Sequence, residues 1–285
     1  MREKIKTYGA IALLLILIPY MITLFFHGGG VGLFQEKSSS SELEEKVIQL
    51  VSEQVSGQAQ MEAIKAQAVI ARTQLYQNPT MEVTGNETNL LENMDTLQFC
   101  VEETQGEILT YEGRPIDPAY HAVSGKFTRN GSEVTGQEDK SYLKSVESLY
   151  DISSPDYLTI VYMEKADFAA KIQGLIADSQ VVVNPETVLT DLVIEARDSA
   201  EYVTKVRYAD VILNGEAVRD ALELPSALFY FSELNGKVRI LVKGLGHGLG
   251  LSQYGANAIA SEGKDYEEIL QYYYSEVEIE RVKSK

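Results

Sequence analysis

A run of closely spaced glycines between Gly244 and Ala256 is the strongest constraint that this sequence places on its own fold. These thirteen residues contain five glycines, with His247, Gln253 and Tyr254 among them. Glycine adopts positive φ readily and, because it lacks a Cβ, allows one backbone to approach another backbone or a ligand closely. The segment therefore displays polar side chains on a backbone shaped for close approach. By itself it is equally compatible with a glycine-rich turn before a helix.

The composition excludes some classes of protein. Hydrophobic residues make up 45% of the chain, which is enough for a real core. The formal net charge of −17 argues against nucleic acid as a partner, because binding a phosphate backbone requires a basic face. Cys100 is the single cysteine, so neither an intrachain disulfide nor a multi-cysteine zinc site can form. We expect Cys100 to be buried and structural.

The N-terminus predicts a membrane anchor. Residues 9–26 contain no charged side chain, and Arg2, Lys4 and Lys6 precede them. A run of this length is near the lower limit for spanning a bilayer, and basic residues on its short side favour a cytoplasmic location for residues 1–8. The rest of the chain is then expected on the extracytoplasmic side of the cell membrane.

A cleaved signal peptide is the alternative to an anchor. The residues that come after the apolar run, 27–30, read His-Gly-Gly-Gly and do not resemble a small-residue cleavage site, which favours the uncleaved anchor. Residues 27–40 are rich in glycine and serine and are typical of a flexible linker. The extracytoplasmic domain is then residues 41–285.

Two helices are predicted at the start of this domain. Ser41 and Glu44 have the spacing of a capping box, and apolar residues recur at helical spacing as far as Val55. Residues 61–76 contain several alanines and no glycine or proline, which predicts a second helix. On a helical wheel its apolar face comprises Ile64, Ala68, Ala71 and Leu75, and its other side comprises Glu62, Lys65, Val69 and Arg72.

The remainder of the domain alternates short strands with short helices. Strand-like runs prevail from Gln98 to Val183, interrupted by a helical run at 166–177. Asn214-Gly215 and Asn235-Gly236 are typical hairpin turns. We further expect strands at 107–111, 159–163, 193–195, 203–208, 227–234 and 238–242, and helices at 218–222, 253–262 and from Asp265 to Tyr274. The pattern predicts an α+β fold, a single compact domain with mixed helices and antiparallel strands.

The residues do not favour metal or serine chemistry. With His27 at the membrane edge, only His121 and His247 remain for the domain, which excludes a three-histidine metal site. A serine nucleophile needs a base within reach, and Ser124 and Ser252 do lie shortly after the two histidines, but Gly-x-Ser-x-Gly fails at Tyr254. Ser252 is more simply the N-cap of the next helix.

A carboxylate on the alanine-rich helix is the remaining candidate. Glu62 has few polar neighbours on that helix, and an apolar surface would raise its pKa, which suits a general acid. Lys65 and Arg72 on the same side act against such a shift. Stabilisation of Glu62 by the helix dipole explains the residue equally well.

Three segments resemble a known family. Residues 62–73 (EAIKAQAVIART), 142–148 (YLKSVES) and 246–256 (GHGLGLSQYGA) closely resemble the signature stretches of the stage II sporulation protein D family, in the same order and spacing. Residues 120–125 and 218–226 resemble two further blocks of that family. The resemblance extends from about Leu43 to the C-terminal helix.

The resemblance implies a membrane-anchored lytic transglycosylase of peptidoglycan. Such enzymes cleave the β-1,4 bond after N-acetylmuramic acid in glycan strands stripped of stem peptides, leave a 1,6-anhydro end, and act during engulfment of the forespore. The family's catalytic glutamate corresponds to Glu62. A glycosidase that uses water normally needs two carboxyl groups. Here the sugar's own C6 hydroxyl attacks, so one carboxyl group can act first as acid and then as base.

Other polar residues of these segments are candidate substrate contacts. Some relatives bind zinc through a histidine and two cysteines after the Tyr-His block. This chain has His121 but no cysteine beyond Cys100, so it departs from that pattern, and we expect neither this zinc site nor another cofactor. Lys126 also replaces a glycine that many relatives carry. The candidate glycan contacts are Gln67, Arg72, His121, Ser124, His247, Ser252, Gln253 and Tyr254. For Gln67 and Arg72 a purely structural role, tying the helix to neighbouring loops, is an equal alternative.

A non-catalytic module is the second functional hypothesis. Relatives that enhance amidases share the glycine-rich block, so the chain could bind peptidoglycan without cleaving it. The resemblance also implies two protein partners, stage II sporulation proteins P and M. Because the domain is acidic, electrostatic attraction would not draw it to an anionic cell wall, so tethering and partners are expected to place it.

Overall fold

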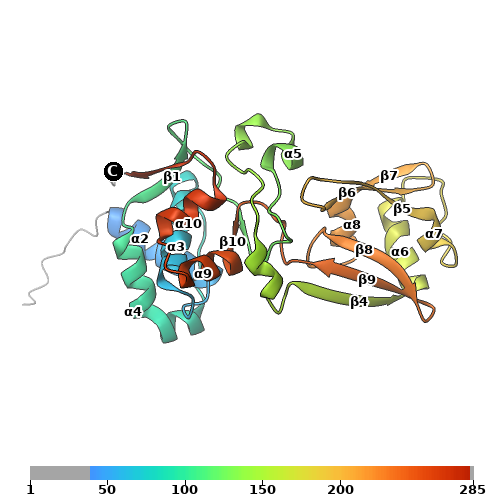
Figure 1. Cartoon of the computed structure of the whole chain (residues 1–285), viewed down its shortest axis with the longest axis horizontal. Helices are drawn as coiled ribbons and strands as arrows, with labels where there is room; N and C mark the ends of the chain where they lie inside the picture. Colours follow the sequence, from blue (N-terminus) through green and yellow to red (C-terminus); the bar gives the residue numbers. More distant parts are fainter. Residues whose placement is uncertain (1–38, 283–285) are drawn as a thin grey trace, which may run out of the picture. The chain divides into compact units, whose positions relative to one another are not determined.

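The computed structural model describes residues 39–282, in which two cores are built from different kinds of element (Figure 1). The helices are α2 (Ser39–Gln54), α3 (Met61–Gln77), α4 (Glu87–Glu103), α5 (Gly131–Thr135), α6 (Lys165–Leu175), α7 (Val188–Asp191), α8 (Gly215–Ala221), α9 (Gln253–Ser261) and α10 (Tyr266–Tyr273), with short 3-10 helices at Glu138–Lys140 and Leu149–Ser153. The strands are β1 (Glu107–Tyr111), β2 (Arg114–Pro115), β3 (Tyr120–His121), β4 (Leu158–Glu164), β5 (Leu192–Arg197), β6 (Val203–Tyr208), β7 (Val211–Asn214), β8 (Phe229–Leu234), β9 (Lys237–Lys243), β10 (Leu251–Ser252) and β11 (Glu278–Arg281).

The strands form small sheets. Three of them have three antiparallel strands, in the orders β11-β1-β2, β4-β9-β8 and β5-β6-β7. The fourth is a two-stranded parallel pair in which Leu251 lies opposite Tyr120 and Ser252 opposite His121. The predicted α+β class, a compact domain with antiparallel sheets, is confirmed.

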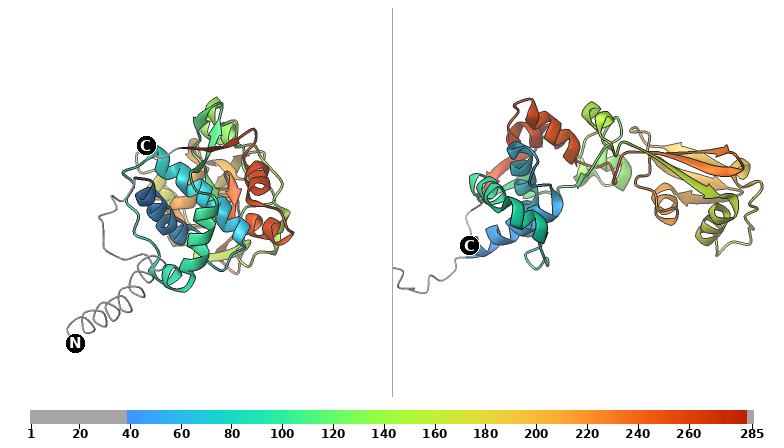
Figure 2. Two further views of the ribbon diagram at one scale, coloured as in Figure 1. Left: turned by 90° about the vertical axis from the view of Figure 1, so that its left-hand side faces the viewer. Right: turned by 90° about the horizontal axis from the view of Figure 1, so that it is seen from below.

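Helix α3 is the centre of the first core (Figure 2). Ile64 and Leu75, on the predicted apolar face, pack with residues of α2 and α4. Ala66 and Val69, on the opposite side, pack with residues of α9 and α10. Alanines let these helices approach closely, so a helix that the wheel described as one-sided is buried on both sides.

The second core lies between the two antiparallel sheets β4-β9-β8 and β5-β6-β7 and helices α6 and α8. Val238, Ile240 and Val242 alternate along β9 and are buried on one face of their sheet. That period of two is what a strand with one buried face requires. Asn235 and Gly236 both have positive φ and close the β8–β9 hairpin as the sequence predicts.

Several local predictions need correction. Asn214-Gly215 is not a hairpin turn: the Asn214 side chain accepts hydrogen bonds from the backbone of Glu216 and Ala217 and caps α8. Gln98 lies in α4 rather than in a strand-like run, because Leu97, Cys100 and Val101 recur at helical spacing and pack on α3. Helix α2 begins at Ser39, so Ser41 is not its N-cap.

The expected anchor at 9–26 and most of the linker at 27–40 lie outside the described residues. Within residues 39–282, every helix is too short or too polar to cross a bilayer.

Candidate functional site

The glycine-rich segment lies against the Tyr-His block. Gly244, Gly246, Gly248 and Gly250 all have positive φ. A Cβ on Gly248 would lie 2.6 Å from the Tyr202 hydroxyl oxygen, so only glycine fits there without displacement. The Val123 and Leu245 backbones exchange hydrogen bonds of 3.0 and 2.8 Å. The close backbone approach that the sequence predicts is thus confirmed.

His121 and His247 lie side by side, with ring centroids 5.8 Å apart. His121 is buried, and its Nδ1 donates to the Leu249 carbonyl at 3.0 Å. Burial, with a smaller contribution from His247, lowers the pKa of His121 to about 3. Burial also lowers the pKa of His247, whose Nδ1 accepts from the Leu249 amide at 3.0 Å. Both rings are therefore neutral at pH 7, and the buried Nε2 of His121 has no hydrogen-bond partner among the described residues.

Ser124 and Ser252 converge on a carboxylate that sequence reasoning missed. Asp151 Oδ1 accepts from the Ser252 hydroxyl at 2.6 Å and from the Ser124 amide at 3.2 Å, and Asp151 Oδ2 accepts from the Ser148 hydroxyl. Burial raises the pKa of Asp151, against the effect of these donors. The Ser252 hydroxyl also accepts from the Gly255 amide at 3.2 Å and so caps α9, as the sequence predicts.

This buried knot joins three of the segments that carry the family resemblance. Ser124 belongs to residues 120–125, Ser148 to 142–148 and Ser252 to 246–256. All three serines and Asp151 are buried, so the Ser148 and Ser252 hydroxyls and the Ser124 amide bind the carboxylate inside the fold. Nothing in the sequence singles out Asp151 among 42 acidic residues.

Arg129 is a second buried residue that the sequence did not reveal. Its guanidinium lies 2.6 Å from the Asp198 carboxylate and 3.2 Å from the His247 carbonyl, and it also contacts Glu216. Its backbone amide donates to the Gly248 carbonyl at 2.7 Å. Arg129 therefore attaches the glycine-rich segment to the second core.

Gln67 and Gln253 meet in a cluster of amides that joins three helices. Gln67 Nε2 on α3 donates to Gln54 Oε1 on α2 at 2.8 Å. Gln253 Nε2 on α9 donates to the Gln54 carbonyl at 2.5 Å and lies 3.3 Å from Gln67 Oε1. Gln67 is buried, whereas Gln253 is half-buried and retains some accessible surface. Tyr254, also half-buried, donates its backbone amide to the Ala122 carbonyl at 3.1 Å.

Arg72 is fully buried and makes structural contacts. Its guanidinium donates to both carboxylate oxygens of Glu44, with Nη2 to Oε2 at 2.7 Å, and to the carbonyls of Val101 at 3.0 Å and Glu107 at 3.2 Å. Its side chain is 0% exposed. This position favours the structural alternative over substrate contact.

Glu62 lies in the first turn of α3, with its side chain 29% exposed. Its Oε1 accepts from Lys65 Nζ at 2.8 Å and its Oε2 from the Tyr266 backbone amide, at the start of α10, at 3.0 Å. Burial alone would lower the pKa of Lys65, but the hydrogen bond and charge of Glu62 outweigh burial and raise it. The surroundings of Glu62 are thus more polar than the alanine-rich helix suggested.

The single cysteine, Cys100, lies near Glu62. Cys100 is buried, as predicted, and its Sγ lies 3.6 Å from the Met61 carbonyl. Burial raises the pKa of Cys100 to about 11, so its thiol stays protonated at neutral pH. Residues 39–282 contain no group of three or more His, Cys, Asp or Glu side chains arranged to hold a metal ion.

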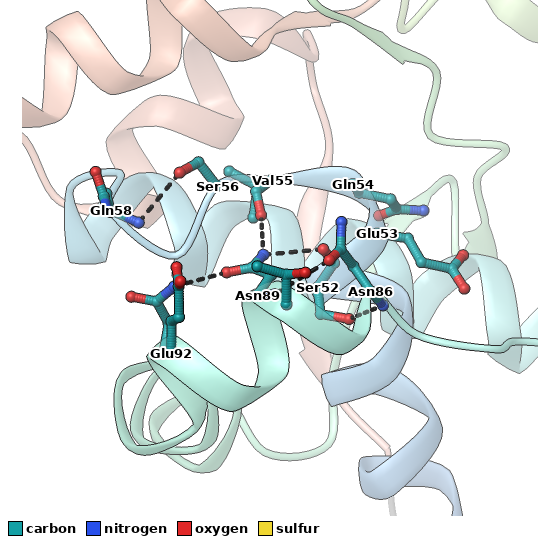
Figure 3. Close-up of a pocket in the computed structure, with 11 residues that line it drawn as sticks. Ser52, Glu53, Gln54, Val55, Ser56, Gln58, Asn86, Asn89 and Glu92 are labelled. Atoms are coloured by element: carbon teal, nitrogen blue, oxygen red, sulfur yellow. Dashed lines mark hydrogen bonds between the residues drawn. The ribbon is translucent and has the colours of Figure 1, made fainter.

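A polar pocket of about 410 Å³ lies between the end of α2 and the start of α4 (Figure 3). Asn89 forms much of its wall and donates to the carbonyls of Ser52 at 2.9 Å and Val55 at 2.8 Å. Glu53 lines it too and accepts from the backbone amide of Gly85 at 2.6 Å. Glu62 and the eight predicted glycan contacts are not among the lining residues.

Comparison with known proteins gives a consistent result. The family model described as "Stage II sporulation protein" matches residues 35–111. The chain is 31% identical to stage II sporulation protein D of Bacillus amyloliquefaciens over 85% of this chain and 75% of that protein, and 31% identical to that of Bacillus subtilis (strain 168) over 83% and 74%. It is 25% identical to the amidase enhancer of Bacillus subtilis (strain 168) over 75% of this chain but 37% of that protein.

Both 31% matches span most of each chain, and the segments that suggested the resemblance are joined by the Asp151 knot and the glutamine cluster. This chain belongs to the stage II sporulation protein D family.

Proposed function

We propose that the chain is a lytic transglycosylase that cleaves peptide-free peptidoglycan strands, with Glu62 as its single acid and base. The observation that supports this most directly is the position of Glu62. It is a partly exposed carboxylate at the start of α3, and α3 packs against the helix that comes after the glycine-rich segment. Of the polar residues in the block 62–73, Gln67 and Arg72 are buried. Glu62 is the carboxylate of this block, and it is partly exposed, so a glycan could reach it.

The proposed reaction uses no water. Glu62 donates its proton to the oxygen that bridges C1 of N-acetylmuramic acid to the next sugar, and the C1–O bond breaks. The C6 hydroxyl of the same muramic acid then attacks C1, and its proton returns to the Glu62 carboxylate. The product is a 1,6-anhydro end, and the acid is regenerated. His247, Gln253 and Tyr254 are half-buried and are the proposed contacts to the sugar.

The test is the product released by Glu62→Gln. Incubation of wild-type protein with peptide-free strands should release anhydro-ended fragments, measured by mass spectrometry, and Glu62→Gln should release none. Glu102→Gln on the exposed side of α4 is a matched control and should behave like the wild type. If Glu62→Gln protein still released anhydro fragments, Glu62 would not be the acid. Fragments with reducing ends would instead indicate a hydrolase.

One observation favours a second function, a non-catalytic amidase enhancer. Both carboxylate oxygens of Glu62 are engaged, by Lys65 and by the Tyr266 amide, and a relative with 25% identity is an amidase enhancer. This hypothesis predicts no cleavage by the protein alone and stimulation of an amidase that survives Glu62→Gln. Adding a cell-wall amidase to the same assay separates the two.

We further propose that residues 9–26 anchor the chain in the cell membrane, with the domain outside, and that stage II sporulation proteins P and M are partners. The charge of −17 supports a need for tethering, because the domain as a whole is repelled by an anionic wall. Release of the domain by a protease site inserted near Gly30 should abolish its concentration at the septum. Unchanged localisation of a fluorescent fusion would contradict this.

A further inference from the structure

One face of the sheet β4-β9-β8 is uncovered in the described part of the chain. Its other face packs on α6 and the second core, through Val238, Ile240 and Val242. On the uncovered face, Leu158, Ile160 and Tyr162 of strand β4 are 49%, 46% and 54% exposed. Three large apolar side chains in a row on a solvated strand are unusual and indicate a binding surface.

Cations border this apolar row. The register places Lys243 of β9 opposite Leu158 and Arg239 opposite Tyr162. Tyr230 of β8 lies opposite Leu241, on the same face, and the Arg197 guanidinium stacks on its ring at 4.3 Å from the centroid. We call these residues the cationic sheet face: Leu158, Ile160, Tyr162, Arg197, Tyr230, Arg239 and Lys243.

Among the described residues, the three cations have no carboxylate partner. Within residues 39–282, neither Arg197, Arg239 nor Lys243 forms an ion pair within 4.0 Å. Arg197 is held in place by carbonyls instead, with Nη1 to Glu201 at 2.7 Å and Nη2 to Phe229 at 2.9 Å. In a chain of 42 acidic and 25 basic residues, three unpaired cations on one face form a local positive surface that suits an anionic ligand.

The cationic sheet face is continuous with the glycine-rich segment. Lys243 is the last residue of β9, and Gly244 begins the glycine-rich segment. The Gly244 amide donates to the Tyr157 carbonyl at 2.8 Å, next to Leu158 at the start of β4. A linear polymer that contacts the glycine-rich segment can therefore extend along this face.

We propose that the cationic sheet face binds peptide-free glycan through the lactyl carboxylates of N-acetylmuramic acid. This rests on the proposed function. Removal of the stem peptide converts each lactyl amide, which is neutral, into a carboxylate, so a stripped strand carries one negative charge per muramic acid. Arg197, Arg239 and Lys243 pair with these charges, and the apolar row contacts the apolar faces of the sugar rings. The face then selects stripped strands over strands that retain their peptides.

The test is a charge reversal measured by binding. Arg239→Glu/Lys243→Glu should weaken the affinity of the full chain for size-selected stripped strands about tenfold or more at low salt, as loss of two charge-assisted contacts requires, and the difference should shrink in high salt. The matched control, Arg114→Glu/Lys205→Glu, makes the same change in net charge at exposed positions outside this face, and should alter affinity less than about twofold. Equal thermal midpoints would show that both variants fold.

A neutral probe identifies the ligand group. Chitin oligosaccharides of matched length have the same backbone without the lactyl carboxylate, and their binding should be insensitive to Arg239→Glu/Lys243→Glu. Unchanged binding of stripped strands would overturn the proposal. This would hold even if the variant no longer bound an acidic protein, because the face would then serve a protein partner and not the glycan. Equal losses with both probes would overturn the role of the carboxylate. A wild-type protein that bound through this face but released no anhydro product would refute the proposed reaction and leave this inference standing.

Discussion

Replacement of Arg72 by methionine should destabilise the fold without changing substrate affinity. The substitution removes a buried guanidinium that pairs with Glu44 and satisfies the carbonyls of Val101 and Glu107. Breaking a buried pair costs about 3 to 5 kcal/mol, and the Glu44 side chain, 16% exposed, can recover part of this by hydration. Two carbonyls left unsatisfied cost about 1 kcal/mol each. We expect a total of about 4 kcal/mol.

At about 2 to 4 °C per kcal/mol, this loss lowers the thermal midpoint by about 8 to 16 °C. The assay is thermal and denaturant unfolding of Arg72→Met, Glu44→Gln and the double variant. Glu44→Gln should lose less than Arg72→Met, because it keeps a neutral acceptor, and the double variant should lose less than the sum of the two. A variant with the wild-type midpoint but weakened glycan binding would refute the structural role of Arg72 and restore its role as a substrate contact.

Three further outcomes are expected at buried positions. Gly248→Ala should lower the free energy of unfolding by about 2 kcal/mol or more, because Gly248 has a positive φ and an added Cβ would clash with the Tyr202 hydroxyl. Its control, Gly174→Ala, lies inside α6 with open space around it and should stabilise the fold by about 0.5 to 1 kcal/mol. Denaturant midpoints of the two variants measure both changes. The pKa of His121 is about 3 in the folded protein, against an ordinary value of 6.5, so the unfolded state binds the proton first as the pH falls. The free energy of unfolding should therefore decrease below about pH 6.5, by about 2 kcal/mol at pH 5. Unfolding measured at pH 7 and pH 5 should show a smaller decrease in His121→Asn. Asp151→Asn should cost about 2 to 4 kcal/mol, since one acceptor oxygen for the buried serines is lost; a near-neutral effect on the unfolding free energy would contradict the knot.

Local patterns predicted much of this fold. Residues 61–76 have no helix breaker, and residues 235–236 have the residue types of a tight hairpin, so both were predicted correctly from sequence alone. The hairpin predicted at Asn214-Gly215 was wrong, because an asparagine can either start a hairpin turn or cap a helix. Tertiary packing of the residues that follow decides between the two, and here Asn214 caps α8. Helix α4 was missed because Leu97, Cys100 and Val101 are buried, whereas its apolar residues Leu91, Met94 and Phe99 are exposed and blur the helical pattern.

The site was less predictable, because burial decides what a polar residue does. Arg72, Ser124, Ser252 and His121 were selected for the polar groups that they carry, yet each is buried and bonded within the protein. Asp151 and Arg129, which hold these segments together, lie outside the recognisable motifs or look like ordinary charges. Sequence shows which groups are present, but only the fold shows which of them face solvent.

This distribution changes what the family signature means. Most of its polar residues in this chain form the Asp151 knot, the Arg72 ties and the glutamine cluster, which hold the fold together. A relative that only enhances an amidase would therefore be expected to retain them, so the signature by itself cannot distinguish a binder from an enzyme. The distinction depends on Glu62, whose partly exposed carboxylate makes few contacts that the core requires. For this reason Glu62→Gln should change the free energy of unfolding by no more than about 1 kcal/mol relative to the wild type. A large loss of stability would instead assign Glu62 to the fold, as the anchor of α10, and would favour the non-catalytic hypothesis.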